Sequence, residues 1–362
     1  MVMNEKNRTD DFELKIKGVI KNTQVTKKQH YVFRHYLSAW AKKDKKEVKT
    51  WCLFKENHKI EYTSIKNTAQ KRYFYEVKSL TDLEKLVVFL TCYWSERVDI
   101  GENPNFMLNI NELWSDFEGN IIDSLGRELV NEFFDKKRKQ IGEDIQCEYE
   151  RMGIDYLNNL MQDNCDFYLD ERCRISFGMY FFMQYVRTNR MKKRIVSNVD
   201  FLFETRAEIV RNLNRFESML SEQSIKIDMR KVKQQMFEFS MNVNIDKIAP
   251  YCLDNMAQVM TKLFTVMHPM KLSLVRAPGG TRFITSDQPI VNILSDSEHN
   301  DIKGHDFYYP LSPTLAISLT PHHSWSVERI KINQESVVNL NRKMYEFSDS
   351  QVYALDKNDF NF

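Results

Sequence analysis

Hydrophobic and polar positions change their period twice along the chain. Between about residues 48 and 77, β-branched and aromatic residues flank the polar run "KENHK", a pattern typical of two strands joined by a turn. From about residue 80 to 267, apolar residues recur every three or four positions, which predicts helices. The first of these helices is expected to start near Thr81, because Glu84 follows three residues later and the pair has the spacing of a capping box.

Strand-like alternation returns at about residue 269. The stretch "MKLSLVRAPGGTRFITSDQPIVNIL" holds two β-branched runs, and Pro278-Gly279-Gly280 between them predicts the turn of a hairpin. A further strand is predicted in "FYYPLSPTLAISLTP", and a short helix and a last strand in "ESVVNLNRKMYEFSDSQVYALD".

These three zones predict the fold class. Two strand-forming segments separated by helices pair most simply into one sheet, with the helices packed on it or beside it. We therefore predict an α+β fold, with a mixed or antiparallel sheet built from N- and C-terminal segments and a large helical middle region. Residues 1–25 are polar and are expected to form a loosely ordered tail. Residues 26–362 are expected to form a single α+β domain with a helical insert at about 80–267.

One segment of the middle region is apolar on nearly every side. It covers residues 172–187 and includes "CRISFGMYFFMQYV", which indicates a buried, central helix. Gln184 and Arg187 are polar positions at its end. Because a buried arginine is costly unless it is paired, Arg187 is expected to meet a carboxylate or a bound anion.

Charge and composition limit the partners and the cellular compartment that we expect for this protein. Lys and Arg number 52 and Asp and Glu 50, so the overall charge gives no reason to invoke nucleic acid or a membrane surface. The N-terminus lacks a signal-peptide core, and the longest apolar run is too short to span a bilayer. The six cysteines form no CxxC pair, which favours free thiols in a reducing cytosol. We expect a soluble, cytoplasmic protein without a membrane partner.

Common catalytic signatures are absent from the chain. It contains no HExxH, CxxC, Walker, GxSxG or EF-hand pattern. The adjacent pair His322-His323 is a weak zinc candidate, because neighbouring side chains on a strand usually point in opposite directions. Polar chemistry is concentrated instead in four short stretches, "KKQHYVFRHYLSAWA", "MQYVRTNRMKKR", "FITSDQP" and "YYPLSP".

Two of these stretches offer candidate reactive groups. In the first, His30 and Arg34 lie four positions apart and would share a face if the stretch were helical. In the third, a strand would bring Thr285, Ser286 and Asp287 to its end, where Pro289 stops the ladder. Each stretch also has a structural interpretation, as a solvated helix edge and as a simple turn respectively.

The order of these stretches resembles a bacterial family with a "HYVP"-type motif, filed as domain of unknown function 4238. The resemblance covers roughly residues 26–355 and includes "VVNLNRKMYEFSDSQVYA" near the C-terminus. The chain has Phe33-Arg34 where the family usually carries Pro-Gln, and Asn189 where proline often follows "RT". The resemblance implies the fold and points at His30, Arg187 and Asp287, but it implies no reaction.

The first functional hypothesis is a hydrolase, such as a nuclease, that acts on a phosphate-containing substrate, either a nucleic acid or a nucleotide. His30 would be the general base or acid, Arg187 would hold a phosphate oxygen, and Asp287 would orient His30 or bind a divalent metal. The candidate substrate-binding residues are Gln29, Gln184, Arg190, Thr285 and Ser286. Such an enzyme could serve as a toxin or phage-defence effector with a protein partner.

The alternative hypothesis is a non-catalytic binding or sensing module. In this case His30, Arg187 and Asp287 form a buried polar network that joins the sheet segments to the central helix, and Asp287 is the partner of the buried arginine. The sequence leaves open the substrate, the metal, the oligomeric state and the choice between the two hypotheses.

Overall fold

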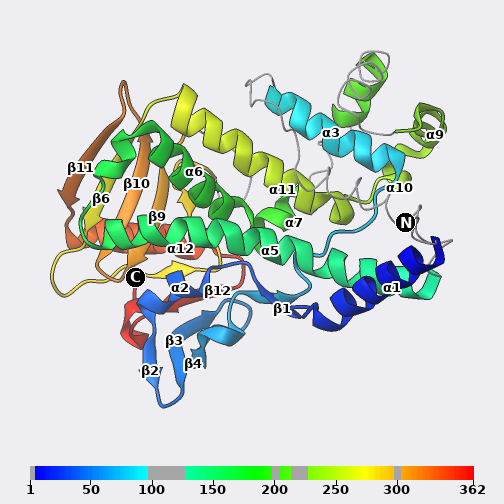
Figure 1. The fold of residues 1–362 in the computed structure, drawn as a ribbon. Helices are drawn as coiled ribbons and strands as arrows, with labels where there is room; N and C mark the ends of the chain where they lie inside the picture. The colour runs from blue at the N-terminus through cyan, green and yellow to red at the C-terminus, as the bar shows by residue number, and fades with distance from the viewer. Residues whose placement is uncertain (1–4, 97–126, 198–203, 213–226, 297–302) are drawn as a thin grey trace. The chain divides into compact units, whose positions relative to one another are not determined.

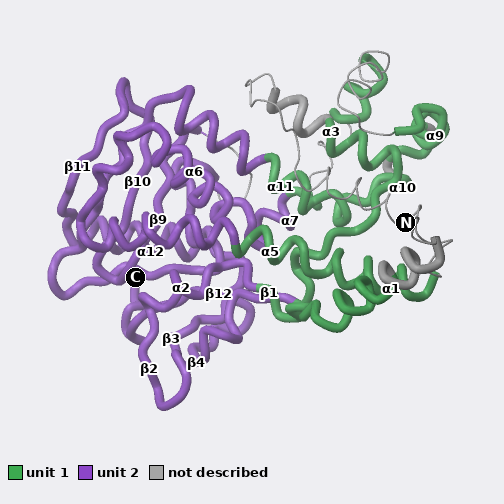
Figure 2. Tube along the Cα trace, in the orientation of Figure 1, with its two compact units in different colours: residues 1–29, 72–147, 195–255 green, residues 30–71, 148–194, 256–362 purple. Residues whose placement is uncertain are grey.

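The computed structural model describes residues 5–96, 127–197, 204–212, 227–296 and 303–362 (Figure 1). The chain divides into two compact units (Figure 2). Unit 1 consists of residues 1–29, 72–147 and 195–255, and unit 2 of residues 30–71, 148–194 and 256–362. Parts of the predicted helical region lie outside the described residues. The expectation of one α+β domain with a helical insert stays a prediction.

Helices make up most of the regular structure in the described part of unit 1. Its elements include α1 (Glu5–Asn22), α3 (Asp82–Glu96), α9 (Met229–Gln235), α10 (Phe239–Asn242) and the first part of α5 (Arg127–Met161). Helix α1 falls within the segment expected to be a loosely ordered tail. Its residues Ile16 and Ile20 pack on Val130 and Phe134 of α5, so α1 is held by an apolar cluster.

The first sheet of unit 2 joins segments from both ends of the chain. Its strands are β2 (Lys42–Asp44), β3 (Glu47–Phe54), β4 (Lys59–Ser64), β7 (Thr285–Ser286) and β12 (Gln351–Ala354). The order is β2-β3-β12-β7, with β4 paired to β3, and every pair is antiparallel. In the register of β12 on β3, Ala354 lies opposite Trp51. The predicted sheet of N- and C-terminal segments is therefore confirmed.

A second sheet of unit 2 comes from the C-terminal third alone. Its strands are β6 (Met270–Arg276), β8 (Val291–Asn292), β9 (Phe307–Ser312), β10 (Leu315–Pro321) and β11 (Ser326–Lys331). The order is β11-β6-β10-β9-β8, and the parallel pair β11–β6 makes this sheet mixed.

The predicted hairpin from residue 270 to 292 is wrong. Strand β6 pairs with β10 and β11, whereas β7 pairs with β12 in the other sheet. The turn itself does form, because Gly280 has a φ of +86° and the Thr281 N–H donates to the Pro278 carbonyl at 3.2 Å. This turn carries the chain from one sheet to the other.

Helix α6 (Glu171–Val186) is the buried helix that the sequence predicts. The Asp170 carboxylate caps it by accepting the Cys173 N–H. Phe181 and Phe182 make edge-on ring contacts with Phe307 of β9. Unit 2 thus has an aromatic core between α6 and the second sheet.

The stretch "KKQHYVFRHYLSAWA", residues 27–41, is not a single helix. It forms β1 (Lys28–His30), α2 (Arg34–Leu37) and a 3₁₀ turn, Ser38–Trp40, while β1 pairs with β5 (Gln70–Arg72). The expectation that His30 and Arg34 share a helix face is wrong, since Phe33 has an extended ψ of 121° between them. The Trp40 indole donates to the Phe283 carbonyl at 2.9 Å, which anchors Trp40 in the core of unit 2.

Candidate functional site

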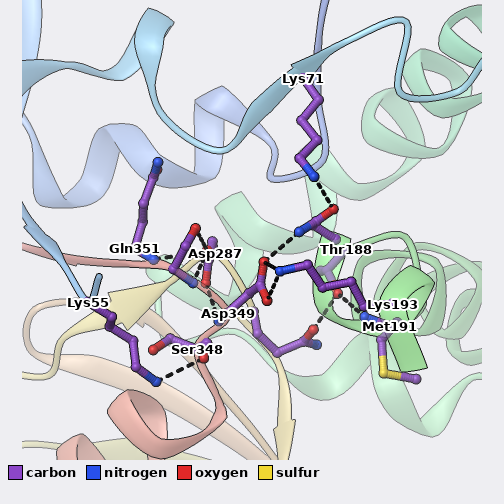
Figure 3. A network of polar contacts seen from close by, with 12 residues as sticks. Lys55, Lys71, Thr188, Met191, Lys193, Asp287, Ser348, Asp349 and Gln351 are labelled. Atoms are coloured by element: carbon purple, nitrogen blue, oxygen red, sulfur yellow. Dashed lines mark hydrogen bonds and ion pairs between the residues drawn. The ribbon is translucent and has the colours of Figure 1, made fainter. Parts of the chain in front are cut away.

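Asp287 directly follows β7, and its side chain is completely buried. One carboxylate oxygen accepts the Asp349 N–H at 2.8 Å. The other accepts the Ser350 N–H at 2.8 Å, the Ser350 hydroxyl at 2.8 Å and the Gln351 N–H at 2.9 Å (Figure 3). All these donors come from one segment, so the carboxylate fixes the turn that leads into β12.

Burial dominates the electrostatics of Asp287. Desolvation raises the pKa of the carboxyl to about 6, although the hydrogen bonds from Ser350 and Asp349 act to lower it. The nearby charge of Asp349 acts in the same direction as burial. At neutral pH the group is mainly ionised, but its oxygens face the protein's own donors.

Arg187, at the end of α6, is also buried, and it meets a carboxylate as predicted. Its Nη2 donates to the Glu150 carboxylate of α5 at 2.6 Å and to the Gln184 side-chain oxygen at 2.9 Å. The Gln184 amide in turn donates to the Tyr31 carbonyl at 3.4 Å. The expectation that Asp287 is the partner of Arg187 is wrong, because α5 supplies the carboxylate.

His30 ends β1 and is partly exposed. Its Nε2 lies 3.2 Å from the Lys66 carbonyl. Burial, followed by the positive charge of Arg34, lowers the pKa of His30 to about 4, and Arg187 contributes in the same direction. The imidazole is therefore neutral at physiological pH. The carboxylate that would orient it in the hydrolase hypothesis, Asp287, is instead bonded to residues 349–351.

Most of the other predicted site residues are buried, and their side chains form hydrogen bonds with other residues of the protein. The Thr285 hydroxyl lies 2.6 Å from the Tyr36 hydroxyl, and the Ser286 hydroxyl donates to the Gln288 carbonyl at 3.0 Å. Gln29 belongs to unit 1, where its amide donates to the Lys139 carbonyl at 2.9 Å. Among the predicted site residues, His30 and Arg190 are the two that reach the surface.

Thr188 and Gln288 form a contact that the sequence did not reveal. The Thr188 hydroxyl, between α6 and α7 (Asn189–Ser197), donates to the Gln288 side-chain oxygen. The Gln288 amide donates to the Tyr185 carbonyl at 2.9 Å and to the Ile290 carbonyl at 2.8 Å. The segment after β7 is thereby tied to the end of the central helix.

The sequence predicted Arg190 as a substrate-binding residue but not the charged group at the start of α7 to which it belongs. We name this group the Asp349 cluster, consisting of Lys71, Asn189, Arg190, Lys193 and Asp349. The Lys193 ammonium donates to both Asp349 oxygens, at 2.7 and 2.9 Å, and the Asn189 amide donates to one of them at 2.5 Å (Figure 3). Lys71 donates to the Asn189 side-chain oxygen at 2.7 Å.

Arg190 completes the Asp349 cluster. Its guanidinium carbon lies 5.4 Å from the centre of the Phe347 ring, in α12 (Gln334–Phe347). Burial and the neighbouring Arg194 lower the pKa of Arg190, while Asp349 and Asp287 act to raise it. The signals that could have found the cluster were the departure at Asn189 and the polar "SDS" before the last strand.

The described ranges offer neither a metal cluster nor a membrane-spanning helix. There, no group of three or more His, Cys, Asp or Glu side chains is placed to hold a metal ion. In the same part of the chain, no helix combines the length and apolarity needed to cross a bilayer.

The fold and these contacts define an α+β protein in which a buried polar network adjoins a surface group of cations. Residues 28–358 match a family model described as a protein of unknown function (DUF4238). Because the match spans most of the sequence, the chain belongs to this family. No curated protein and no solved structure matches it.

Proposed function

We propose that this chain is a non-catalytic binding module whose ligand is a phosphate-containing anion, bound by the cations of the Asp349 cluster. The observation that carries the proposal is the difference in accessibility between the two groups of polar residues. Asp287 and Arg187 are buried and bonded to the protein itself, whereas the Lys193 side chain is 61% exposed.

The buried position of Asp287 weighs against hydrolysis. A general base must come within hydrogen-bonding distance of the proton that it removes. The Asp287 oxygens would reach a substrate only after losing four hydrogen bonds and releasing the 349–351 turn. To bind a phosphate, the Arg187 guanidinium would similarly have to leave the Glu150 carboxylate, and breaking this ion pair is costly because Arg187 is buried.

The charge of the Asp349 cluster favours an anionic ligand. Lys71, Arg190 and Lys193 are cations, and two carboxylates, Asp349 and the buried Asp287, act on Arg190. Phosphate oxygens form short, charge-assisted hydrogen bonds with lysine and arginine. The like charge of Arg194 beside Arg190 adds to the positive potential of this surface.

Isothermal titration calorimetry on the full chain tests the proposal. Pyrophosphate and ATP are titrated into wild type, Lys193→Met and a matched control, Lys331→Met, at the exposed end of β11. We expect Lys193→Met to weaken binding about tenfold, the effect of losing one charge-assisted contact of about 1.4 kcal/mol, and Lys331→Met to bind like wild type. Binding should weaken as the salt concentration rises.

Phosphate release is followed for the same ligands, with and without magnesium or manganese. We expect no turnover by wild type. Turnover that is lost in His30→Ala would overturn the proposal in favour of a hydrolase, and equal binding by Lys193→Met and wild type would remove the Asp349 cluster as the site. The toxin and phage-defence hypotheses are tested separately, by inducible expression in a bacterial host scored for growth arrest.

A further inference from the structure

Within the Asp349 cluster, the Asp349 carboxylate accepts hydrogen bonds from other members as a bound anion would. Its two carboxylate oxygens accept from Lys193 at 2.7 and 2.9 Å, and one of them also accepts from the Asn189 amide. Lys71 donates to the Asn189 oxygen at 2.7 Å, so the amide must present its NH₂ group to the carboxylate. The donors are therefore already oriented toward an acidic oxygen.

The backbone of Asp349 is fixed independently of its side chain. Its N–H donates to the buried Asp287 carboxylate at 2.8 Å, and the flanking Ser350 N–H does the same. The Asp349 side chain itself is 11% exposed, so it lies at the edge of the protein. Rotation of this side chain into solvent would open the donors without disturbing the Asp287 turn.

A tethered carboxylate is a strong competitor for an incoming anion, because its effective concentration is about millimolar or higher. An internal phosphodiester carries one negative charge, the same as this carboxylate. A terminal phosphate carries about −1.5 to −2 at neutral pH and has three acceptor oxygens. Against the same cations, the terminal phosphate gains more from the exchange.

We propose that Asp349 selects for terminal phosphate groups, which bind by displacing its carboxylate from Lys193 and Asn189, and against internal phosphodiesters, which cannot displace it. The inference rests on the proposed function and specifies its ligand. A terminal phosphate occurs both on a free nucleotide and at the end of a nucleic acid, and the experiment separates these two sources.

The test compares ligands that differ in the state of one phosphate. The first pair is AMP and 3′,5′-cyclic AMP, and the second is a short single-stranded DNA with a 5′-phosphate or a 5′-hydroxyl. Affinities are measured for wild type, Asp349→Asn and Glu61→Gln, a control that removes one exposed carboxylate from β4. Asp349→Asn keeps the backbone N–H that Asp287 accepts.

Wild type and Glu61→Gln are expected to prefer the terminal phosphate at least about tenfold in one or both pairs. Preference in the first pair alone indicates a free nucleotide, and preference in the second indicates a nucleic-acid end. Asp349→Asn should bind the disfavoured member about tenfold more tightly and lose most of the preference. Asp349→Ser, which also removes the charge, should behave in the same way if Asp349→Asn folds poorly.

Two results overturn the inference in distinguishable ways. If folded Asp349→Asn and Asp349→Ser keep the wild-type preference, Asp349 does not select the ligand, although dependence of binding on Lys193 would leave the proposed function standing. If wild type and both variants bind none of the four ligands, the inference and the proposed function fall together.

Discussion

The Arg187 guanidinium donates to the Glu150 carboxylate at 2.6 Å, which pairs the end of α6 with α5 inside unit 2. Asp287 takes no part in this ion pair, because its oxygens accept the N–H groups of residues 349–351. The polar residues that sequence motifs suggest as one site thus have two separate structural tasks. Arg187 stabilises helix packing, and Asp287 shapes a turn.

Glu150→Gln should destabilise the chain, because it removes the carboxylate charge that pairs with the buried Arg187 guanidinium. Removing one partner of a buried ion pair costs roughly 3–5 kcal/mol, and the 20% exposure of Glu150 reduces our expectation to about 2–3 kcal/mol. Urea denaturation measures the change. Glu148→Gln, which breaks an exposed pair with Arg151, should cost under about 1 kcal/mol, and equal costs for the two variants would contradict the assignment.

Asp287→Asn should change how stability depends on pH. The folded-state pKa of Asp287, about 6, lies above its ordinary value of 3.8, so the folded chain binds the proton more tightly. The stability that this group contributes is complete below pH 3.8 and is lost as pH rises through about 6. Asparagine does not titrate, so the stability gap between wild type and variant should narrow over this range.

Urea midpoints at several pH values between 4 and 7 give that gap for Asp287→Asn. A gap that widened with rising pH would mean that the four hydrogen bonds to the carboxylate outweigh its burial. The ionised Asp287 carboxylate would then stabilise the folded chain mainly through its hydrogen bonds to the turn.

Local signals in the sequence were sufficient for some elements. Thr81 and Glu84 do form the capping box, with the Thr81 N–H donating to the Glu84 carboxylate at 2.8 Å, because both partners lie within one turn of helix. The apolar residues on nearly every side of α6 similarly predicted that this helix is buried. In both cases the information lies inside the element.

Partnerships between distant segments were not predictable in this way. The sequence indicates that Arg187 needs a carboxylate, but the identity of Glu150, 37 positions away, depends on how α5 packs. The run from β6 to β7 shows two strands and a genuine turn, yet strand propensity does not say which edge each strand joins. The Asp349 cluster was missed because its members come from three separate parts of the chain.

His30 should titrate well below an ordinary histidine. Its folded-state pKa is about 4 against 6.5, so the stability that it contributes is complete above pH 6.5 and is lost as pH falls toward 4. His30→Gln should reduce this acid sensitivity. NMR titration of the imidazole, assigned by the same variant, measures the pKa directly, and an inflection at or above pH 6.5 would disprove the half-buried, neutral state.

Gly153→Ala should destabilise the chain although alanine is the better helix former. A Cβ at this position of α5 would overlap the ring of Tyr180, which is buried and bonded to the Tyr309 hydroxyl at 2.9 Å. Overpacking of this kind costs about 1–3 kcal/mol. In thermal unfolding, Gly279→Ala is the control, since a Cβ there meets no atom within 4 Å, and similar melting temperatures for the two variants would refute the overlap.

Strand β3 can pair with β12 only late in synthesis, because the two strands lie far apart in the sequence. The Thr50 hydroxyl donates to the Ala354 carbonyl, 304 positions later in the chain. At about 5–20 residues per second, a ribosome needs roughly 15 to 60 s to deliver β12 after β3 has been made. Throughout that interval one edge of β3 near Trp51 lacks its final neighbour. The nascent chain is therefore expected to depend on chaperones that shield unpaired strands until translation is nearly finished.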